Sequence, residues 1–187
     1  MKKIFIFICI ILSNMIIAQT TEDLDAKNGF RHFKFGSSSS QIKNIVKQEN
    51  QYSKNPYVTV YDYVGTDIKT IFNVDVEDVT LTFFKDKLCS IQVFFGSLRL
   101  KKDFTLEEFK RVLVALENTY GEEWVNSLNQ DGAIINSAIW NAKDIRLELC
   151  RLDFSKSKID PVDYGFIAGY IHIMHKKLHN QIYTSEF

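Results

Sequence analysis

The chain has 187 residues, 45% hydrophobic and 13% aromatic, and it carries 23 Lys or Arg residues against 23 Asp or Glu residues. This composition predicts a packed globular protein and excludes a disordered chain. The balanced charge leaves no basic footprint for nucleic acid, so we expect no nucleic-acid partner.

Residues 1–18 have the pattern of a secretory signal peptide. Two lysines precede an apolar run over residues 4–17, and Ala18 offers a small residue for cleavage. The run is too short for a membrane span, which needs about 20 apolar residues. We therefore expect a secreted or periplasmic bacterial protein with no membrane span after cleavage. Its mature part, residues 19–187, would form a single domain with a formal charge of 21 − 23 = −2.

The first mature segments are short. Residues 19–29 are polar and acidic, which predicts a loose start of the mature chain. FRHFKFG then predicts an aromatic strand that ends at Gly36. SSSSQIKNIVKQEN has serine caps, apolar residues on one helical face, and a capping box formed by Ser38 and Gln41. We expect a helix there.

Apolar and polar residues alternate with period two from Pro56 onward, which predicts a series of strands. YVTVYDYV and DIKTIFNVDV are the first two strands, and the acidic residues at 75–78 mark the next turn. The following hairpin must place Val79–Phe83 and Cys89–Phe95 on one face, so odd-numbered residues have to oppose odd-numbered residues. A three-residue loop, Lys85 to Lys87, satisfies that parity.

FTLEEFKRVLVALENTYG, residues 104–121, is the clearest helix in the chain. Thr105 and Glu108 predict a capping box at its start, and Phe104 with Phe109 predicts a hydrophobic staple. Gly121 predicts its end. The apolar stripe of this helix should lie across the sheet face that carries Leu81, Phe83, Ile91 and Val93.

The rest of the chain predicts a loop at residues 122–132 and strands at AIINSAIW, DIRLELCRL and GFIAGYIHIM, followed by a tail or short helix. This order favours the α+β class, with an antiparallel meander sheet and two main helices packed on one face. Residues 30–100 and 101–175 would be two units of a loose duplication, each a helix followed by a meander.

The stretch FKFGSSSSQIKNIV, together with the helix ending at Tyr120-Gly121, resembles the units of small exported bacterial envelope proteins. The family is the envelope lipoprotein and β-lactamase-inhibitor-like group. The resemblance implies a helical segment on an antiparallel sheet and a role in binding or assembly without catalysis. Glu122 stands where that family has a proline, and no lipidation cysteine follows the leader. It assigns no functional residue.

Cys89 and Cys150 are the two cysteines outside the leader, in a compartment that permits disulfides. The alternation places Cys89 on the apolar face with Ile91, and Cys150 on the opposite face with Glu148. Two sulfurs on opposite faces of one sheet cannot form a disulfide, so we expect both thiols to be free.

Two groups of residues suggest metal sites. His172, His175 and His179 would share a face of a helix, but His172 lies in a strand pattern, so we expect no zinc site. The acidic cluster at Asp75, Glu77 and Asp78 lacks the spacing of a calcium loop and is interpreted as a polar turn. The sequence also shows no catalytic nucleophile motif and no cofactor fingerprint.

Tyr57, Tyr61 and Tyr63 lie on one face of a predicted strand and form the candidate binding surface. The alternative is that they simply cover the sheet face opposite to the core-facing Val58 and Val60. The sequence favours an exported, non-catalytic module that binds another envelope or extracellular protein. Two alternatives stay open: a small secreted hydrolase or carbohydrate-binding domain with a site assembled from distant residues, and an inhibitor or immunity-type protein.

Overall fold

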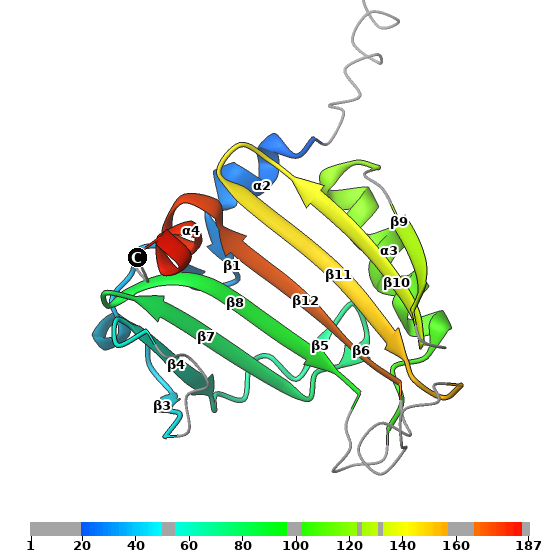
Figure 1. The fold of residues 1–187 in the computed structure, drawn as a ribbon, viewed down its shortest axis with the longest axis horizontal. Helices are drawn as coiled ribbons and strands as arrows, with labels where there is room; N and C mark the ends of the chain where they lie inside the picture. Colours follow the sequence, from blue (N-terminus) through cyan, green and yellow to red (C-terminus); the bar gives the residue numbers. More distant parts are fainter. Residues whose placement is uncertain are drawn as a thin grey trace, which may run out of the picture.

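The computed structural model describes residues 20–49, 55–96, 102–122, 125–130, 133–156 and 167–184. The chain forms an α+β fold around an eight-stranded antiparallel sheet, as the order of elements predicts (Figure 1). The strands, in their order across the sheet, are β3 (Ile45–Lys47), β4 (Val58–Tyr63), β7 (Asp78–Phe84), β8 (Lys87–Phe95), β12 (Ile167–His175), β11 (Ile145–Asp153), β10 (Ala133–Asn141) and β9 (Val125–Gln130).

Two small hairpins are not paired with this sheet and form two-stranded sheets of their own. The first pairs β1 (Gly29–Phe30) with β2 (Phe33–Lys34), and the second pairs β5 (Thr70–Ile71) with β6 (Val74–Asp75). Within the described residues, no helix is long and apolar enough to cross a membrane.

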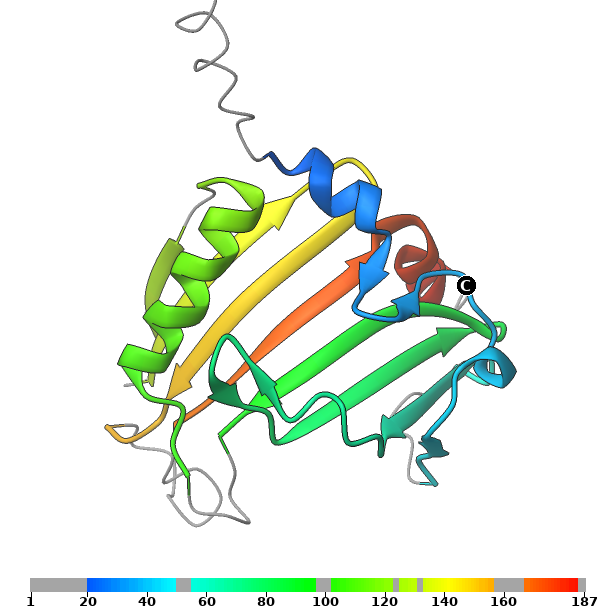
Figure 2. The same cartoon turned by 180° about the vertical axis from the view of Figure 1, so that it is seen from behind.

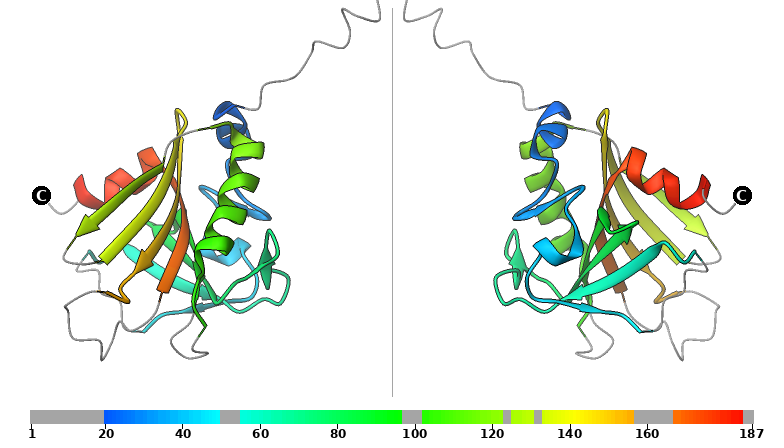
Figure 3. Two further views of the ribbon diagram at one scale, coloured as in Figure 1. Left: turned by 90° about the vertical axis from the view of Figure 1, so that its right-hand side faces the viewer. Right: turned by 90° about the vertical axis from the view of Figure 1, so that its left-hand side faces the viewer.

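The two faces of the sheet have different covers. The helices α2 (Glu22–Lys27) and α3 (Leu106–Tyr120), together with the two hairpins, lie on one side, which we call the core face (Figure 2). The helix α4 (Lys176–Thr184) lies on the opposite side, which we call the α4 face (Figure 3). The main hydrophobic cluster fills the core face, and a smaller one, with Val58, Phe84 and Cys89, lies under Leu178 and Ile182 of α4.

Helix α3 confirms its sequence signals. Thr105 Oγ1 accepts the Glu108 backbone N–H and the Glu108 carboxylate accepts the Thr105 N–H, so the capping box is complete. The Phe104 and Phe109 rings meet edge-on, with their centroids 6.4 Å apart. Gly121 follows the helix with φ of 83°. The helix lies over β10 and β11, while the hairpins lie over β12 and β8 on the same face (Figure 2).

The β7–β8 hairpin has the predicted parity from Asp78 to Thr82, but neither the predicted pairing of Phe83 with Cys89 nor the predicted loop. Leu81 pairs with Ile91, odd with odd, yet the loop has only two residues, Lys85 and Asp86, both with positive φ. A β-bulge supplies the extra residue, because Phe83 pairs with Leu88 while Thr82 pairs with Ser90. Cys89 is therefore the inserted residue, and it turns to the α4 face instead of the core face.

Three further predictions of secondary structure from short sequence patterns were wrong. The helix expected after Gly36 is a single 3₁₀ turn at Ser39–Gln41 followed by edge strand β3, although its capping box is present. The loop expected at residues 122–132 contains strand β9. DIKTIFNVDV folds into the separate β5–β6 hairpin.

The start expected to be loose contains α2. Leu24 of this helix is fully buried, and the Asp25 carboxylate accepts the N–H groups of residues 143, 144 and 145 at the β10–β11 turn. These two contacts hold a six-residue helix that would not be stable alone.

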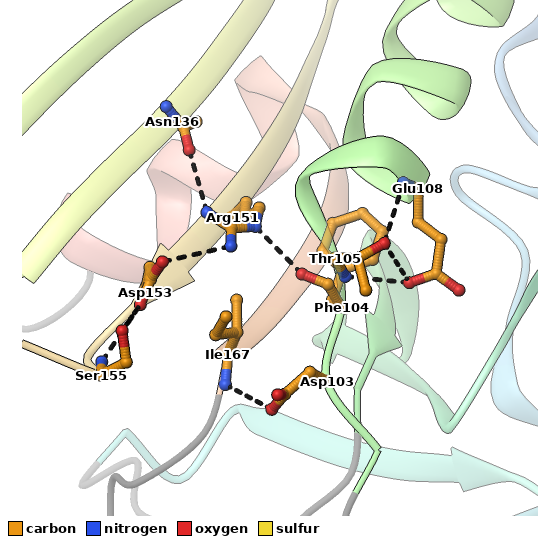
Figure 4. Close-up of polar contacts among 9 residues, drawn as sticks. All are labelled: Asp103, Phe104, Thr105, Glu108, Asn136, Arg151, Asp153, Ser155 and Ile167. Carbon is orange, nitrogen blue, oxygen red and sulfur yellow. Dashed lines mark hydrogen bonds and ion pairs between the residues drawn. The ribbon is translucent and has the colours of Figure 1, made fainter.

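Arg151 ties the start of α3 to the sheet. This buried side chain donates from Nε to the Phe104 carbonyl at 3.0 Å and from its terminal nitrogens to Asn136 and Asp153 (Figure 4). The Phe104 ring lies against Gly169 of β12, where an added Cβ would come within 2.2 Å of it. The chain segment leading into α3 is thus fixed to β10, β11 and β12 together.

We expect Arg151→Met to destabilise the protein by about 3 kcal/mol, because it removes the buried donor of the Phe104 carbonyl and the ion pair with Asp153, whose carboxylate is left with its contacts to Ser155. Arg111→Met in α3 is the matched control, since it removes an exposed ion pair with Glu107, worth at most about 1 kcal/mol, and an exposed hydrogen bond to the Asn73 carbonyl. Urea unfolding measures both. Equal losses for the two variants would show that Arg151 does not anchor α3.

Candidate functional site

The three tyrosines of the candidate binding surface do not form one surface. Tyr61 and Tyr63 face the core: the Tyr61 ring meets the Phe83 ring edge-on at 5.2 Å, and Tyr63 is 9% exposed and packs against Phe33. Tyr57, just before β4, is 53% exposed. The valines that were expected in the core lie instead on the α4 face.

The three histidines are divided between the two faces of the sheet. His172 and His179 meet on the α4 face with ring centroids 5.9 Å apart, whereas His175 lies beside Phe35. His172 Nε2 is 2.6 Å from the hydroxyl of Ser90. The described part of the chain holds no group of three or more His, Cys, Asp or Glu side chains that could bind a metal ion.

The acidic turn is partly engaged in local contacts. Asp75 forms an ion pair with Lys102, and Asp78 accepts the backbone N–H of Val79 at 2.8 Å. The carboxylates of Asp75 and Asp78 are therefore directed to separate partners. This arrangement agrees with the interpretation of a polar turn.

Both described cysteines are free and buried. They lie on the same face, contrary to the expectation, because the bulge at Cys89 reverses its direction. Cys150 pairs with Tyr170, which pairs with Phe94, so Cys150 lies two strands and five residues away from Cys89. This separation is roughly 15 Å or more, which is too far for a disulfide. Burial raises the pKa of the Cys89 thiol to about 12, so little of the reactive thiolate forms at neutral pH.

The Ser90–His172 pair resembles half of a catalytic dyad, but it is enclosed. Ser90 is 4% exposed, and neither residue lines the two pockets described below. Burial, followed by the nearby His179 and Arg146, lowers the pKa of His172 to about 4. Burial lowers the pKa of His179 as well. Both rings are therefore neutral at pH 7 and serve the packing of α4.

One pocket opens on the core face between α3 and the two hairpins, and we call it the α3 pocket. It has a volume of about 380 Å³ and reaches Ile171 of β12. Its lining is Lys27, Gly29, Phe30, Arg31, Phe72, Leu116, Thr119, Tyr120 and Ile171. The walls are mostly apolar, and the two cations donate to neutral oxygens: Lys27 to the Tyr120 hydroxyl and Arg31 to the Asp67 and Thr70 carbonyls.

A second pocket lies at the end of the sheet where β8 begins and β12 leads into α4, and we call it the lysine pocket. It has a volume of about 470 Å³. Its lining is Asn28, Phe35, Gly36, Phe84, Lys85, Lys87, His175, Lys177, Leu178 and Gln181. These residues come from three parts of the chain, and no sequence pattern pointed to either pocket.

The buried histidines make stability depend on pH. Their pKa values are lowered in the folded state, so the unfolded chain binds more protons between about pH 6.5 and about pH 4. The free energy of unfolding should therefore fall as the pH drops through that window, by up to about 3 kcal/mol. Arg146 and Glu148, which pairs with His172 across the strands, are further charged groups near His172, and both stay unchanged in the variants below.

Urea unfolding at about pH 7 and about pH 5 measures this loss. The double variant His172→Gln, His179→Gln should flatten the pH dependence. His32→Gln, at an exposed histidine beside Asp67, should leave it unchanged. An equally steep decline in the double variant would mean that other groups cause the acid sensitivity.

No protein-family model matches this chain, and no curated protein or solved structure is significantly similar to it. The resemblance to exported envelope proteins therefore stays a prediction, and the two pockets are the features from which a function can be argued.

Proposed function

We propose that this chain is an exported, non-catalytic binding protein whose ligand site is the α3 pocket. The ligand is a small apolar molecule with one negatively charged group. Export rests on the signal-peptide pattern of residues 1–18, which lie outside the described residues. Binding rests on the α3 pocket, whose apolar lining reaches the sheet and whose rim carries two cations.

The lining supports this ligand class. Ligand pockets usually combine apolar walls with a few polar groups that fix the orientation of the ligand. Leu116, Ile171 and the aromatic rings of Phe30 and Phe72 supply the walls. Lys27 donates to a neutral hydroxyl and Arg31 to backbone carbonyls. The Asp67 carboxylate also interacts electrostatically with Arg31, so Lys27 has the more available charge. A carboxylate at the mouth would be bound by the two cations, with its apolar part inside.

The hydrolase alternative has weaker support. Its best candidate is the Ser90–His172 pair, yet Ser90 is buried and its hydroxyl contacts the imidazole beneath α4. A nucleophile must reach its substrate, and this hydroxyl lines neither pocket.

The inhibitor or immunity alternative would need one continuous protein-binding surface. Tyr57 and Val64, 53% and 59% exposed, lie just before and just after β4, and Val46 on the neighbouring edge strand β3 is 54% exposed. Tyr57 is seven residues and roughly 23 Å from Val64 along β4, so the three side chains do not form one continuous patch.

Isothermal titration of the purified protein with decanoate tests the α3 pocket. We expect decanoate to bind and decanol to bind about ten-fold more weakly, because decanol lacks the charge that Lys27 and Arg31 recognise. Thr119→Trp should abolish binding by filling the pocket from α3.

Val114→Trp is the matched control, because Val114 lies on the same helix and is 52% exposed to solvent. It should leave decanoate binding unchanged. Binding that survives Thr119→Trp, or no binding of decanoate at all, would contradict the proposed site.

A further inference from the structure

We propose that the lysine pocket is a second, separate site, which binds a small organic molecule carrying a phosphate group. It shares no lining residue with the α3 pocket, so the inference does not depend on the proposed function.

The lining concentrates positive charge. Lys85, Lys87 and Lys177 line the pocket, and its lining includes no Asp or Glu. The Lys85 ammonium lies 5.2 Å from the centre of the Tyr57 ring and 5.3 Å from that of Phe84, contacts that leave its charge unneutralised. Lysine binds phosphate as a point charge, and three lysines match a dianion.

The nearest carboxylate in the chain is directed elsewhere. Asp86 lies between Lys85 and Lys87 in the β7–β8 turn, but it accepts both the backbone N–H and the hydroxyl of Ser39, at 3.0 and 2.7 Å. Residues 85 and 86, both with positive φ, form the two-residue turn between β7 and β8. Both donors to Asp86 are neutral groups, so Asp86 keeps its negative charge. The turn with Lys85 and Lys87 therefore contributes a net charge of +1, to which Lys177 adds a second positive charge.

The pocket lining also includes a histidine with an unpaired ring nitrogen. His175 Nδ1 is buried and has no hydrogen-bond partner among the described residues. A buried polar atom without a partner costs free energy, so a rotation of this ring that brings a protonated nitrogen to a phosphate oxygen would lower that cost. The side-chain amides of Asn28 and Gln181 line the same pocket and add further donors.

The ligand has to be larger than a free phosphate ion. A volume of about 470 Å³ is typical of a pocket for a small organic molecule. Phe35, Phe84 and Leu178 give part of the lining an apolar surface. An aromatic or aliphatic group would lie on these side chains while its phosphate contacts the lysines.

Titration of the purified protein with phenyl phosphate tests this site. Calorimetry measures the binding, and NMR records the signals of the His175 ring. We expect phenyl phosphate to bind and to shift those signals. Inorganic phosphate should bind more weakly, and phenol should not bind. The triple variant Lys85→Gln, Lys87→Gln, Lys177→Gln should weaken phenyl phosphate binding about ten-fold or more.

The matched control is the triple variant Lys43→Gln, Lys69→Gln, Lys110→Gln, which removes three positive charges from exposed lysines outside the pocket. It should leave the affinity unchanged. Equal weakening in the two triple variants would show attraction by net charge alone and overturn the proposal. Failure of phenyl phosphate to bind at millimolar concentration, or equal binding of phenol, would overturn it too. Thr119→Trp should not affect this titration, which separates the failure of one pocket from that of the other.

Discussion

The pairing of β12 with β8 is the contact on which the rest of the structure depends. It joins residues 169–174 to residues 90–95 and so merges β3, β4, β7 and β8 with β9–β11 into one sheet. Bringing such distant segments together costs conformational entropy, which the burial of apolar side chains offsets. Ile91 and Ile173 face each other in this pairing, and both are almost completely buried. Each half of the sheet therefore supplies part of the same core.

The width of the merged sheet explains why the α3 pocket exists. Eight strands about 4.8 Å apart span roughly 34 Å, whereas a single helix is only about 10 Å wide. Helix α3 covers the β10–β11 side of the core face, and the β1–β2 and β5–β6 hairpins cover the other side (Figure 2). The border between these covers lies over β12, where Ile171 forms part of the pocket lining. A binding pocket at this border needs no further distortion of the fold.

The sequence predicted elements whose signals are local, and it failed where distant contacts decide. The capping box of α3 and the strands β10, β11 and β12 are predicted from neighbouring residues alone, and they are confirmed. The parity of the β7–β8 hairpin was right up to Thr82 and wrong at Phe83. An extra residue in the loop, as predicted, and an extra residue at Cys89, as found, give the same parity for the rest of the hairpin. Alternation in β4 could not tell which face is the core, because α4 covers the second face and makes valine suitable there. The pockets were beyond prediction, since Lys177 and Lys85 come together only when β12 pairs with β8.

Helix α4 connects the buried histidines to the lysine pocket. Leu178 and Ile182 pack on the sheet beside Cys89, and His179 lies against His172. The pocket is lined by Lys177 and Gln181, which directly precede Leu178 and Ile182 in the sequence. The same docking of the helix thus buries its apolar side and presents Lys177. A ligand that binds only the docked helix would stabilise it by mass action, and protonation of the two histidines would oppose it. A ligand in the lysine pocket and the protonation of His172 and His179 would therefore act in opposite directions on the packing of α4 against the sheet.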